Sequence, residues 1–196
     1  MQLEFYFDVG SPTAYLAWCR LEQLVAGHGL SVVKRPMLLG GVFKAAGSAS
    51  PVSVPAKGRY MLEQDLPRFA ARYGVPLNFS PHFPINTLTL MRGVFAARDA
   101  GCEDAYVATV FRAIWVDAAN MGDPAVVRAT LEKAGLDAQA LMEGCAKPAV
   151  KQALIEATEE AVARGVFGAP TMFIGDDMFF GQDRLDFVEE RLSSDT

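Results

Sequence analysis

Segments with the pattern of β-strands stand only near the two ends of this chain, and almost everything between them has a helical pattern. The first end holds two apolar segments, residues 2–8 and 30–35. The stretch between them predicts a helix over residues 12–26, ended by Gly27 and Gly29. A strand–helix–strand unit normally places its two strands parallel in one sheet.

The second end predicts a β-hairpin. Thr171–Ile174 and Met178–Phe180 are strand-like and flank Gly175-Asp176-Asp177, which has the composition of a tight turn. A final helix is expected over residues 184–192. Because neither end has enough strands for a sheet of its own, we expect both to build one sheet. The predicted fold class is therefore α/β.

The middle of the chain predicts an all-helical domain inserted over residues 58–165, which leaves a discontinuous sheet-building domain over 1–57 and 166–196. Gly, Pro and Asp separate its helical segments. Residues 39–58, rich in Gly, Ser, Ala and Pro, predict a long loop, and loops of that length are more often functional than idle. The predicted helices cover 58–73, 86–99, 103–118, 124–134, 137–145 and 149–164.

Composition narrows the possible partners. The net charge of −5 and the pI near 5.1 argue against binding to nucleic acid. No apolar stretch approaches the ~20 residues that a membrane span requires. Met1 leads directly into a strand pattern rather than into a secretory signal. We therefore expect a cytoplasmic protein that binds neither nucleic acid nor membrane.

The sequence predicts no metal site. Cys19, Cys102 and Cys145 never form a CxxC pair, and His28 and His82 lack metal-ligand spacing. Cys19 lies in an apolar helical pattern, where cysteine is more often a small buried hydrophobe than a reactive thiol. No Ser-His-Asp arrangement, GxSxG turn or phosphate-binding glycine loop is recognisable.

The turn before the first helix carries the first candidate for chemistry. Many proteins with such a turn have a redox cysteine pair there, but this chain has Ser11, Pro12, Thr13 and Ala14. Ser11 is a good N-cap, and Pro12 suits the first helical position. A hydroxyl there lies beside backbone N–H groups and the positive end of the helix dipole, which stabilise an anion such as a bound thiolate. An ordinary helix cap is the alternative.

Two further candidates lie in the second half of the predicted sheet. A proline entering a strand, as Pro170 does, often marks a cis bond or a sheet edge. A cis bond after Ala169 would expose the Ala169 backbone for pairing with an extended ligand; a trans proline on an edge strand is the alternative. Gly181-Gln182-Asp183 predicts a carboxylate and free N–H groups at another helix start, suited to a zwitterionic ligand, although aspartate is also a preferred cap.

FYFDVGSPTAYLA at the start and GVFGAPTMFIGDDMFFGQDRL at the end resemble the 2-hydroxychromene-2-carboxylate isomerases, relatives of the kappa-class glutathione transferases. VPAKGRYMLEQDLPRFAARYGVP (54–76) and HFPINTLTLMR (82–92) match the same pattern, so the resemblance covers nearly the whole chain. It implies a thioredoxin-like fold with a helical insertion, glutathione as cofactor and a homodimer. In this family serine replaces the cysteine because the thiol arrives with glutathione.

The resemblance also implies a role for individual residues. Ser11 would be the catalytic residue that holds the glutathione sulfur as a thiolate, and Ala169 would pair with the cysteinyl backbone of glutathione. Lys44 would meet the carboxylate or phenolic oxygen of the substrate. The implied glutathione-binding residues are Ser11, Ser48, Pro55, Lys57, Ala169, Pro170, Phe180, Gly181, Gln182 and Asp183, and the implied substrate residues are Lys44, Ser53, Val54, Phe83 and Asn86.

Two positions depart from the family pattern. Relatives commonly have Asn at the position of Ser48, and some isomerases have Tyr at that of Phe83. A serine hydroxyl reaches less far than an asparagine amide, and phenylalanine lacks a polar group. The contacts at these two positions are therefore expected to differ from the family pattern, which leaves the exact substrate open.

The function implied by the resemblance is glutathione-dependent isomerisation of 2-hydroxychromene-2-carboxylate or a related intermediate of aromatic hydrocarbon breakdown, such as naphthalene degradation. A thiolate would add to the conjugated system, a bond would rotate, and elimination would return glutathione. One alternative is a kappa-like transferase that conjugates glutathione to electrophiles. Another is a non-catalytic peptide- or thiol-binding module. A disulfide oxidoreductase is disfavoured because Ser11 and Ala14 occupy both redox positions.

Overall fold

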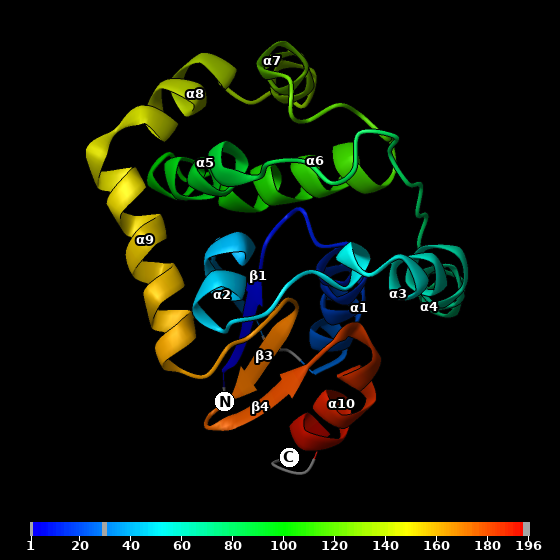
Figure 1. Cartoon of the computed structure of the whole chain (residues 1–196). Coiled ribbons are helices and arrows are strands. Elements are labelled where there is room, and N and C mark those ends of the chain that lie inside the picture. Colours follow the sequence, from blue (N-terminus) through cyan, green and yellow to red (C-terminus); the bar gives the residue numbers. More distant parts are fainter. Residues whose placement is uncertain (1, 29–30, 194–196) are drawn as a thin grey trace.

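The computed structural model describes residues 2–28 and 31–193 and contains one mixed sheet with the strand order β2-β1-β3-β4 (Figure 1). β1 (Leu3–Phe7) pairs in parallel with β2 (Val32–Pro36). On its other side β1 pairs antiparallel with β3 (Thr171–Ile174), which pairs antiparallel with β4 (Asp177–Phe180). The predicted α/β class is thus confirmed, and the two ends of the chain do form one sheet.

The predicted helices are present with shifted ends. The first, α1, continues through Gly27 to His28, whereas Gly29 and Leu30 lie outside the described residues. The helices are α1 (Pro12–His28), α2 (Leu39–Ala45), α3 (Pro55–Tyr60), α4 (Leu66–Tyr73), α5 (Leu88–Asp99), α6 (Glu103–Trp115), α7 (Pro124–Lys133), α8 (Ala138–Ala146), α9 (Pro148–Ala163) and α10 (Leu185–Ser193). Three short turns join them: the 3-10 turns η1 (Pro51–Ser53) and η3 (Gln182–Arg184), and the π-helical turn η2 (Met61–Asp65).

The prediction of a long loop over residues 39–58 is wrong for most of that stretch, which contains α2, η1 and the start of α3. Proline and glycine suggested a loop, but Pro51 and Pro55 stand at the starts of η1 and α3, where the missing N–H is not needed. Gly41 lets α2 approach α9 closely, since an added Cβ would lie 3.0 Å from Thr158 Cγ2. Only residues 46–50 and Val54 lie outside helical turns.

Helices cover both faces of the sheet, with α2 and α9 on one side and α1 and α10 on the other (Figure 1). Side chains of successive strand residues point to opposite faces. Phe5 and Phe7 therefore join the larger core, while Tyr6 packs with Val42 of α2 and Phe173 in a smaller cluster beside α9. Because both faces are covered, β1 is apolar along almost its whole length.

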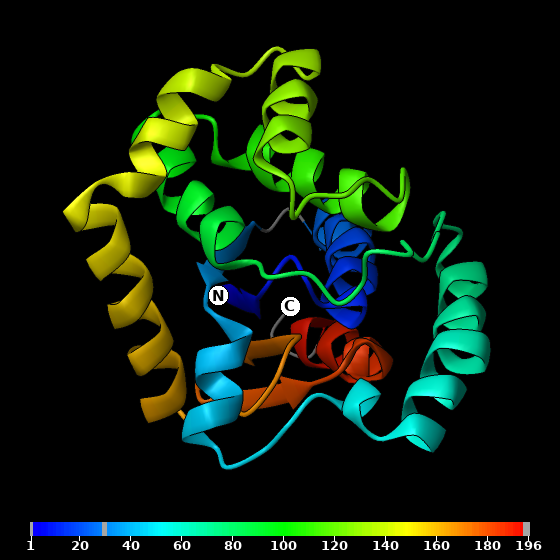
Figure 2. The ribbon, with the colours of Figure 1, turned by 45° about the horizontal axis from the view of Figure 1, so that its top comes forward.

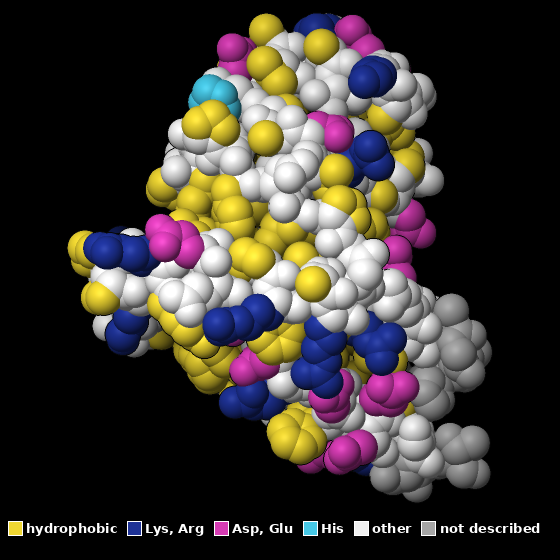
Figure 3. Space-filling model, turned by 90° about the vertical axis from the view of Figure 1, so that its right-hand side faces the viewer, with side chains coloured by type: hydrophobic (Ala, Val, Ile, Leu, Met, Phe, Trp, Pro, Cys, Tyr) yellow, Lys and Arg dark blue, Asp and Glu magenta, His cyan; other side chains and the backbone are white. Residues whose placement is uncertain are grey.

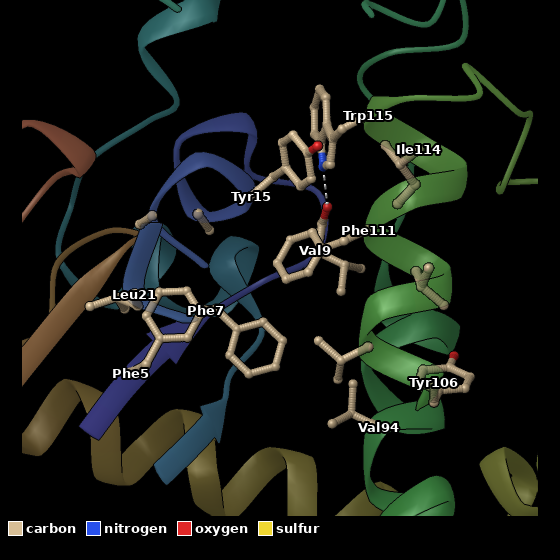
Figure 4. Packing of buried hydrophobic residues seen from close by; sticks show 14 of the residues in the cluster. Phe5, Phe7, Val9, Tyr15, Leu21, Val94, Tyr106, Phe111, Ile114 and Trp115 are labelled. Carbon is tan, nitrogen blue, oxygen red and sulfur yellow. Dashed lines mark hydrogen bonds between the residues drawn. The ribbon is translucent and has the colours of Figure 1, made fainter. Parts of the chain in front are cut away.

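The larger core continues without interruption from the sheet into the helical region. Phe111 of α6 lies against Phe7, Tyr15 and Trp18, with ring centroids 5.4–5.9 Å apart. The indole N–H of Trp115 donates to the carbonyl of Val9 at 2.8 Å (Figure 4). Residues on both sides of the proposed boundaries therefore share one core, and the division into 1–57 with 166–196 and 58–165 stays a prediction.

The outer surface mixes both signs of charge. On the face drawn in Figure 3, Lys and Arg lie among Asp and Glu, and hydrophobic side chains gather across the middle. Examples of paired charges are Arg72 with Asp186, 2.8 Å apart, and Arg191 with Asp177, also 2.8 Å apart. No helix in the described part of the chain combines the length and the apolar character needed to cross a membrane.

Gly93 lets α5 and α6 pack closely, which gives a testable effect on stability. A Cβ added at Gly93 would lie 2.0 Å from the hydroxyl oxygen of Tyr106, a buried side chain that donates to Leu90 O. We expect Gly93→Ala to lower the free energy of unfolding by about 1–3 kcal/mol, because the ring has to move within a packed core. Gly40→Ala on α2 is the control, since nothing lies within 4 Å of its added Cβ. Urea unfolding of both variants measures the difference, and an undiminished stability of Gly93→Ala would contradict the packing.

Candidate active site

A cavity of about 410 Å³ opens where α1, α2, η2 and the start of β3 meet. Its wall combines the hydroxyl of Ser11, the backbone around Ala169, and the carboxylates of Asp65 and Asp183. The remaining lining residues are Gly10, Pro12, Thr13, Leu39, Phe43, Ser48, Ala49, Ser50, Pro51, Met61, Phe83, Phe167, Gly168, Phe180, Gly181 and Gln182. Eight of the predicted site residues thus come together in one place: Ser11, Ser48, Phe83, Ala169, Phe180, Gly181, Gln182 and Asp183.

Ser11 is the N-cap of α1. Its Oγ accepts the N–H of Ala14 at 3.1 Å, which leaves the hydroxyl hydrogen free to be donated. Thr13 Oγ1 lies 2.8 Å from Ser11 Oγ and donates to Ala169 O at 3.0 Å. Since the single Thr13 hydrogen goes to Ala169, the contact between the two hydroxyls uses the Ser11 hydrogen. A charged acceptor in the cavity would compete well for that hydrogen, because hydrogen bonds to ions are stronger than those between neutral groups.

Asp8 holds the Ser11 turn in place through hydrogen bonds. This buried carboxylate accepts from Gly10 N at 2.9 Å, Leu39 N at 2.9 Å and Thr87 Oγ1 at 3.0 Å. Burial raises its pKa above the ordinary value, and the three donors act in the opposite direction. Asp8 therefore ties the ends of α2 and α5 to the turn that carries Ser11.

The bond between Ala169 and Pro170 is cis, as the sequence suggested. The alternative of a trans proline on an edge strand is wrong, because β3 lies between β1 and β4. The Ala169 carbonyl accepts from Thr13 Oγ1, and Ser11 Oγ lies 3.3 Å from the same carbonyl oxygen. The backbone beside Pro170 and the Ser11 turn thus form one continuous wall of the cavity.

Gly181-Gln182-Asp183 begins η3 on the other side of the cavity. Gly181 has a φ of 100°, a conformation that favours glycine. Its N–H donates to Pro170 O at 3.0 Å, so the prediction of a free N–H group is wrong for Gly181. Asp183 pairs with Arg184 and faces Asp65, whose pKa is raised first by burial and then by the charge of Asp183. Two carboxylates on one wall favour a cationic group of a ligand.

Comparison with known proteins shows which family this chain belongs to. The family model described as a DSBA-like thioredoxin domain matches residues 2–193. The chain belongs to this family. The 2-hydroxychromene-2-carboxylate isomerase of Sphingobium xenophagum is 37% identical over 192 residues, which cover 97% of each chain.

Two further relatives agree with the predicted resemblance. Glutathione S-transferase kappa 1 of Homo sapiens is 30% identical over 207 residues, covering 97% of this chain and 90% of that protein. A solved structure of a 2-hydroxychromene-2-carboxylate isomerase matches with a TM-score of 0.89 and 34% identity, over 99% of this chain and 95% of that one. The predicted thioredoxin-like fold is confirmed.

The other predicted site residues of this DSBA-like protein lie outside the cavity lining. The carbonyl of Pro170 accepts a hydrogen bond from Gly181 N, and Asn86 Oδ1 accepts from Leu88 N at the start of α5. Lys44 is an exposed residue of α2. Ser53, Val54, Pro55 and Lys57 are exposed around η1 and the start of α3. Their implied roles stay predictions.

The cavity also contains residues that the sequence did not single out. Thr13 was present in the quoted motif SPTA, but its contact with Ala169, 156 residues away, has no local signal. Phe167 packs against Phe180 with ring centroids 4.5 Å apart and the ring planes tilted by 47°, and the two residues are partly exposed at 43% and 41%. Together with Phe43, they give one side of the cavity an aromatic wall.

The three cysteines are free thiols away from the cavity lining. Burial raises the pKa of Cys19 to about 11, so its thiol stays protonated at neutral pH and is a poor nucleophile. Burial also raises the pKa of Cys145, which donates to the backbone of its own helix. Within the described residues, no group of three or more His, Cys, Asp or Glu side chains is placed to hold a metal ion.

Proposed function

We propose that this protein is a glutathione-dependent isomerase acting on 2-hydroxychromene-2-carboxylate or a related aromatic intermediate. The observation that carries the proposal is the position of Ser11: its hydroxyl caps α1, lines the cavity and lies 3.3 Å from Ala169 O. This is where a thiol-handling fold has its own cysteine, and this chain has a hydrogen-bond donor instead. The similarity to 2-hydroxychromene-2-carboxylate isomerases over nearly the whole chain supports the same reaction.

The residues of the cavity fit glutathione. Ser11 and Ala169 at one end suit a thiol beside an extended backbone, as in β-augmentation. Asp65 and Asp183 at another part of the wall suit the ammonium of a γ-glutamyl group. The volume of about 410 Å³ lies within the usual range for small-ligand sites.

The chain contributes chiefly electrostatics and position to the reaction. Bound glutathione would supply a nucleophilic thiolate that adds reversibly to a conjugated substrate and leaves unchanged. The Ser11 hydroxyl would donate to that sulfur, which lowers the pKa of the thiol, while the N-terminal N–H groups of α1 add the positive end of the helix dipole. Phe43, Phe167 and Phe180 would hold an aromatic substrate beside it and exclude water.

Asp65 gives glutathione affinity a pH dependence. Its pKa is raised in the free protein, so protonation removes a favourable charge at a higher pH than for an ordinary aspartate. We expect affinity to fall as pH is lowered through that pKa, and Asp65→Asn to bind up to about fivefold more weakly at neutral pH. Calorimetric titrations between pH 4 and pH 8 measure both effects. Equal affinity of wild type and variant across that range would contradict the role of Asp65.

An absorbance time course tests the reaction itself. With 2-hydroxychromene-2-carboxylate and substoichiometric glutathione, we expect many turnovers per glutathione and none in a glutathione-free control. Consumption of one glutathione per product would instead identify a kappa-like transferase, the candidate favoured by the relationship to glutathione S-transferase kappa 1. A non-catalytic module would bind unstructured peptides without preference for glutathione and would turn over nothing.

Further parts of the proposal rest on the family resemblance. A cytoplasmic homodimer is expected, and size-exclusion chromatography with light scattering measures the assembly. Lys44, Ser53 and Val54 are proposed to border the bound substrate, and Pro55 and Lys57 the glycyl end of glutathione. Because these residues are exposed, they are free to reach a ligand that extends beyond the cavity.

A further inference from the structure

A second cavity of about 430 Å³ lies on the other side of α2, between α2, α5 and α9. Figure 2 shows α9 running beside α2 at one side of the molecule. We call this cavity the α9 groove. The residues that line it are Leu38, Gly41, Ala45, Leu88, Arg92, Lys151, Leu154, Ile155, Thr158, Glu159, Val162 and Ala163.

The α9 groove is apolar with a positive group on one wall. The residues of α9 that line it recur at intervals of three and four, so one whole face of the helix points into it. Ile155, at 48% exposed, stands at the opening. The polar side chain of Thr158 is already satisfied, since it accepts from Leu38 N and donates to Leu154 O.

Arg92 supplies the positive group on the wall of the α9 groove. It lies one helical turn after Leu88 on α5, and its Nε is buried with no hydrogen-bond partner among the described residues. A buried guanidinium N–H left unpaired is unfavourable, and a carboxylate is the planar acceptor that fits it best. Lys151 adds a second positive charge and Glu159 a single negative one, so the lining carries an excess of positive charge.

We propose that the α9 groove binds a small apolar carboxylate, with the carboxylate on Arg92 and the ring or chain against Leu154, Ile155 and Val162. The volume lies within the usual range for small-ligand sites. Charge complementarity selects an anion, and the apolar walls select one with a hydrocarbon body.

The groove and the active-site cavity share a wall. Gly41 and Ala45 of α2 line the groove, while Leu39 and Phe43 of the same helix line the cavity that contains Ser11. Occupation of the groove therefore contacts the back of the helix that carries Phe43. The site is separate from the proposed glutathione site, and the proposal does not depend on it.

Titration of the full chain with 2-naphthoate, followed by calorimetry, tests the proposal. We expect one site in addition to any in the active-site cavity, about tenfold weaker in Arg92→Gln and lost in Ile155→Trp, which fills the opening. The neutral methyl 2-naphthoate is expected to bind at least tenfold more weakly than the acid. Arg112→Gln, an exposed arginine of α6, and Phe167→Ala, in the other cavity, are the controls and should retain this site.

Three results would overturn the proposal. One is an unchanged affinity for 2-naphthoate in both Arg92→Gln and Ile155→Trp. Another is loss of all binding in Phe167→Ala while Ile155→Trp binds as well as the wild type. That result would assign the ligand to the active-site cavity. The third is absence of any binding of 2-naphthoate to the wild-type protein. In that case, conversion of a dimer to a monomer by Ile155→Asp would show that a second copy of the chain covers the groove. Arg92→Lys keeps the positive charge and serves as the conservative variant. The melting temperature of each variant shows whether a loss of binding is caused by a loss of folding.

Discussion

Replacing Ser11 by alanine is expected to lower glutathione-dependent kcat/KM about tenfold to a hundredfold. A charge-assisted hydrogen bond to a thiolate contributes about 1.5–3 kcal/mol, and its loss translates into that range of rates. Steady-state kinetics at saturating and limiting glutathione separate an effect on the reaction from one on affinity. Undiminished turnover in Ser11→Ala would remove Ser11 from the proposed mechanism.

Loss of the helix cap accompanies this substitution and needs its own control. Ser11 accepts the Ala14 N–H, so alanine also destabilises α1 by about 1 kcal/mol. Asp123→Ala removes the side-chain cap of α7, which accepts from Ala125 N at 2.8 Å, and Asp123 is not among the residues that line the cavity. We expect Asp123→Ala to lose similar stability while keeping its kcat/KM.

The ionisation of bound glutathione gives a second measure of Ser11. A donor favours the charged form of the sulfur, so the thiol pKa should be lowered in the complex and should rise again in Ser11→Ala. Thiolate absorbance in the ultraviolet, recorded against pH for each complex, measures this directly. Equal thiol pKa values in the two complexes would show that the serine acts only as a helix cap.

Replacing Phe111 by alanine is expected to lower the free energy of unfolding by about 3–5 kcal/mol. The ring is fully buried and contacts Phe7, Tyr15 and Trp18, so its removal leaves a cavity where β1, α1 and α6 meet. Urea unfolding followed by far-ultraviolet circular dichroism measures the change. Phe187→Ala is the matched control, because that ring is 55% exposed and its loss should alter stability by less than about 0.5 kcal/mol.

The same experiment tests whether the helical region is an independent unit. Because the core is continuous, tryptophan fluorescence and circular dichroism should report one coincident transition in both wild type and variant. Two separated transitions would support autonomous folding of residues 58–165.

Much of this fold follows from local patterns in the sequence. The apolar strand before Ser11-Pro12 and the hairpin around Gly175 have strong local signals, and the structure has both elements. The stretch over residues 39–58 was mispredicted because glycine and proline lower helix propensity on average. Gly41 instead serves the close contact of α2 with α9, which only the tertiary structure reveals.

The candidate site was predictable where one short motif contains the chemistry. Ser11 and Ala169 stand in such motifs, whereas the contacts that bring them together join residues more than 150 positions apart. Asp65 lies in a helical segment without a motif, and its position opposite Asp183 depends on how η2 packs. The orphaned Nε of Arg92 likewise has no sequence signal, because an arginine on a helix is ordinarily solvated.

Asp8 has a consequence for how this scaffold could change its substrate. Asp8 accepts hydrogen bonds from Leu39, the first residue of α2, and from Thr87, the residue before α5. It makes no hydrogen bond to residues 46–54 or 75–86, which lie between these two points. Residues 46–54 are the natural place for insertions and deletions, since they can vary without moving the Ser11 turn, whereas Pro76 O accepts the hydroxyl of Tyr15 on α1 at 2.8 Å. Grafting residues 46–54 between relatives is therefore the exchange that we expect to alter substrate range while preserving the thiol site.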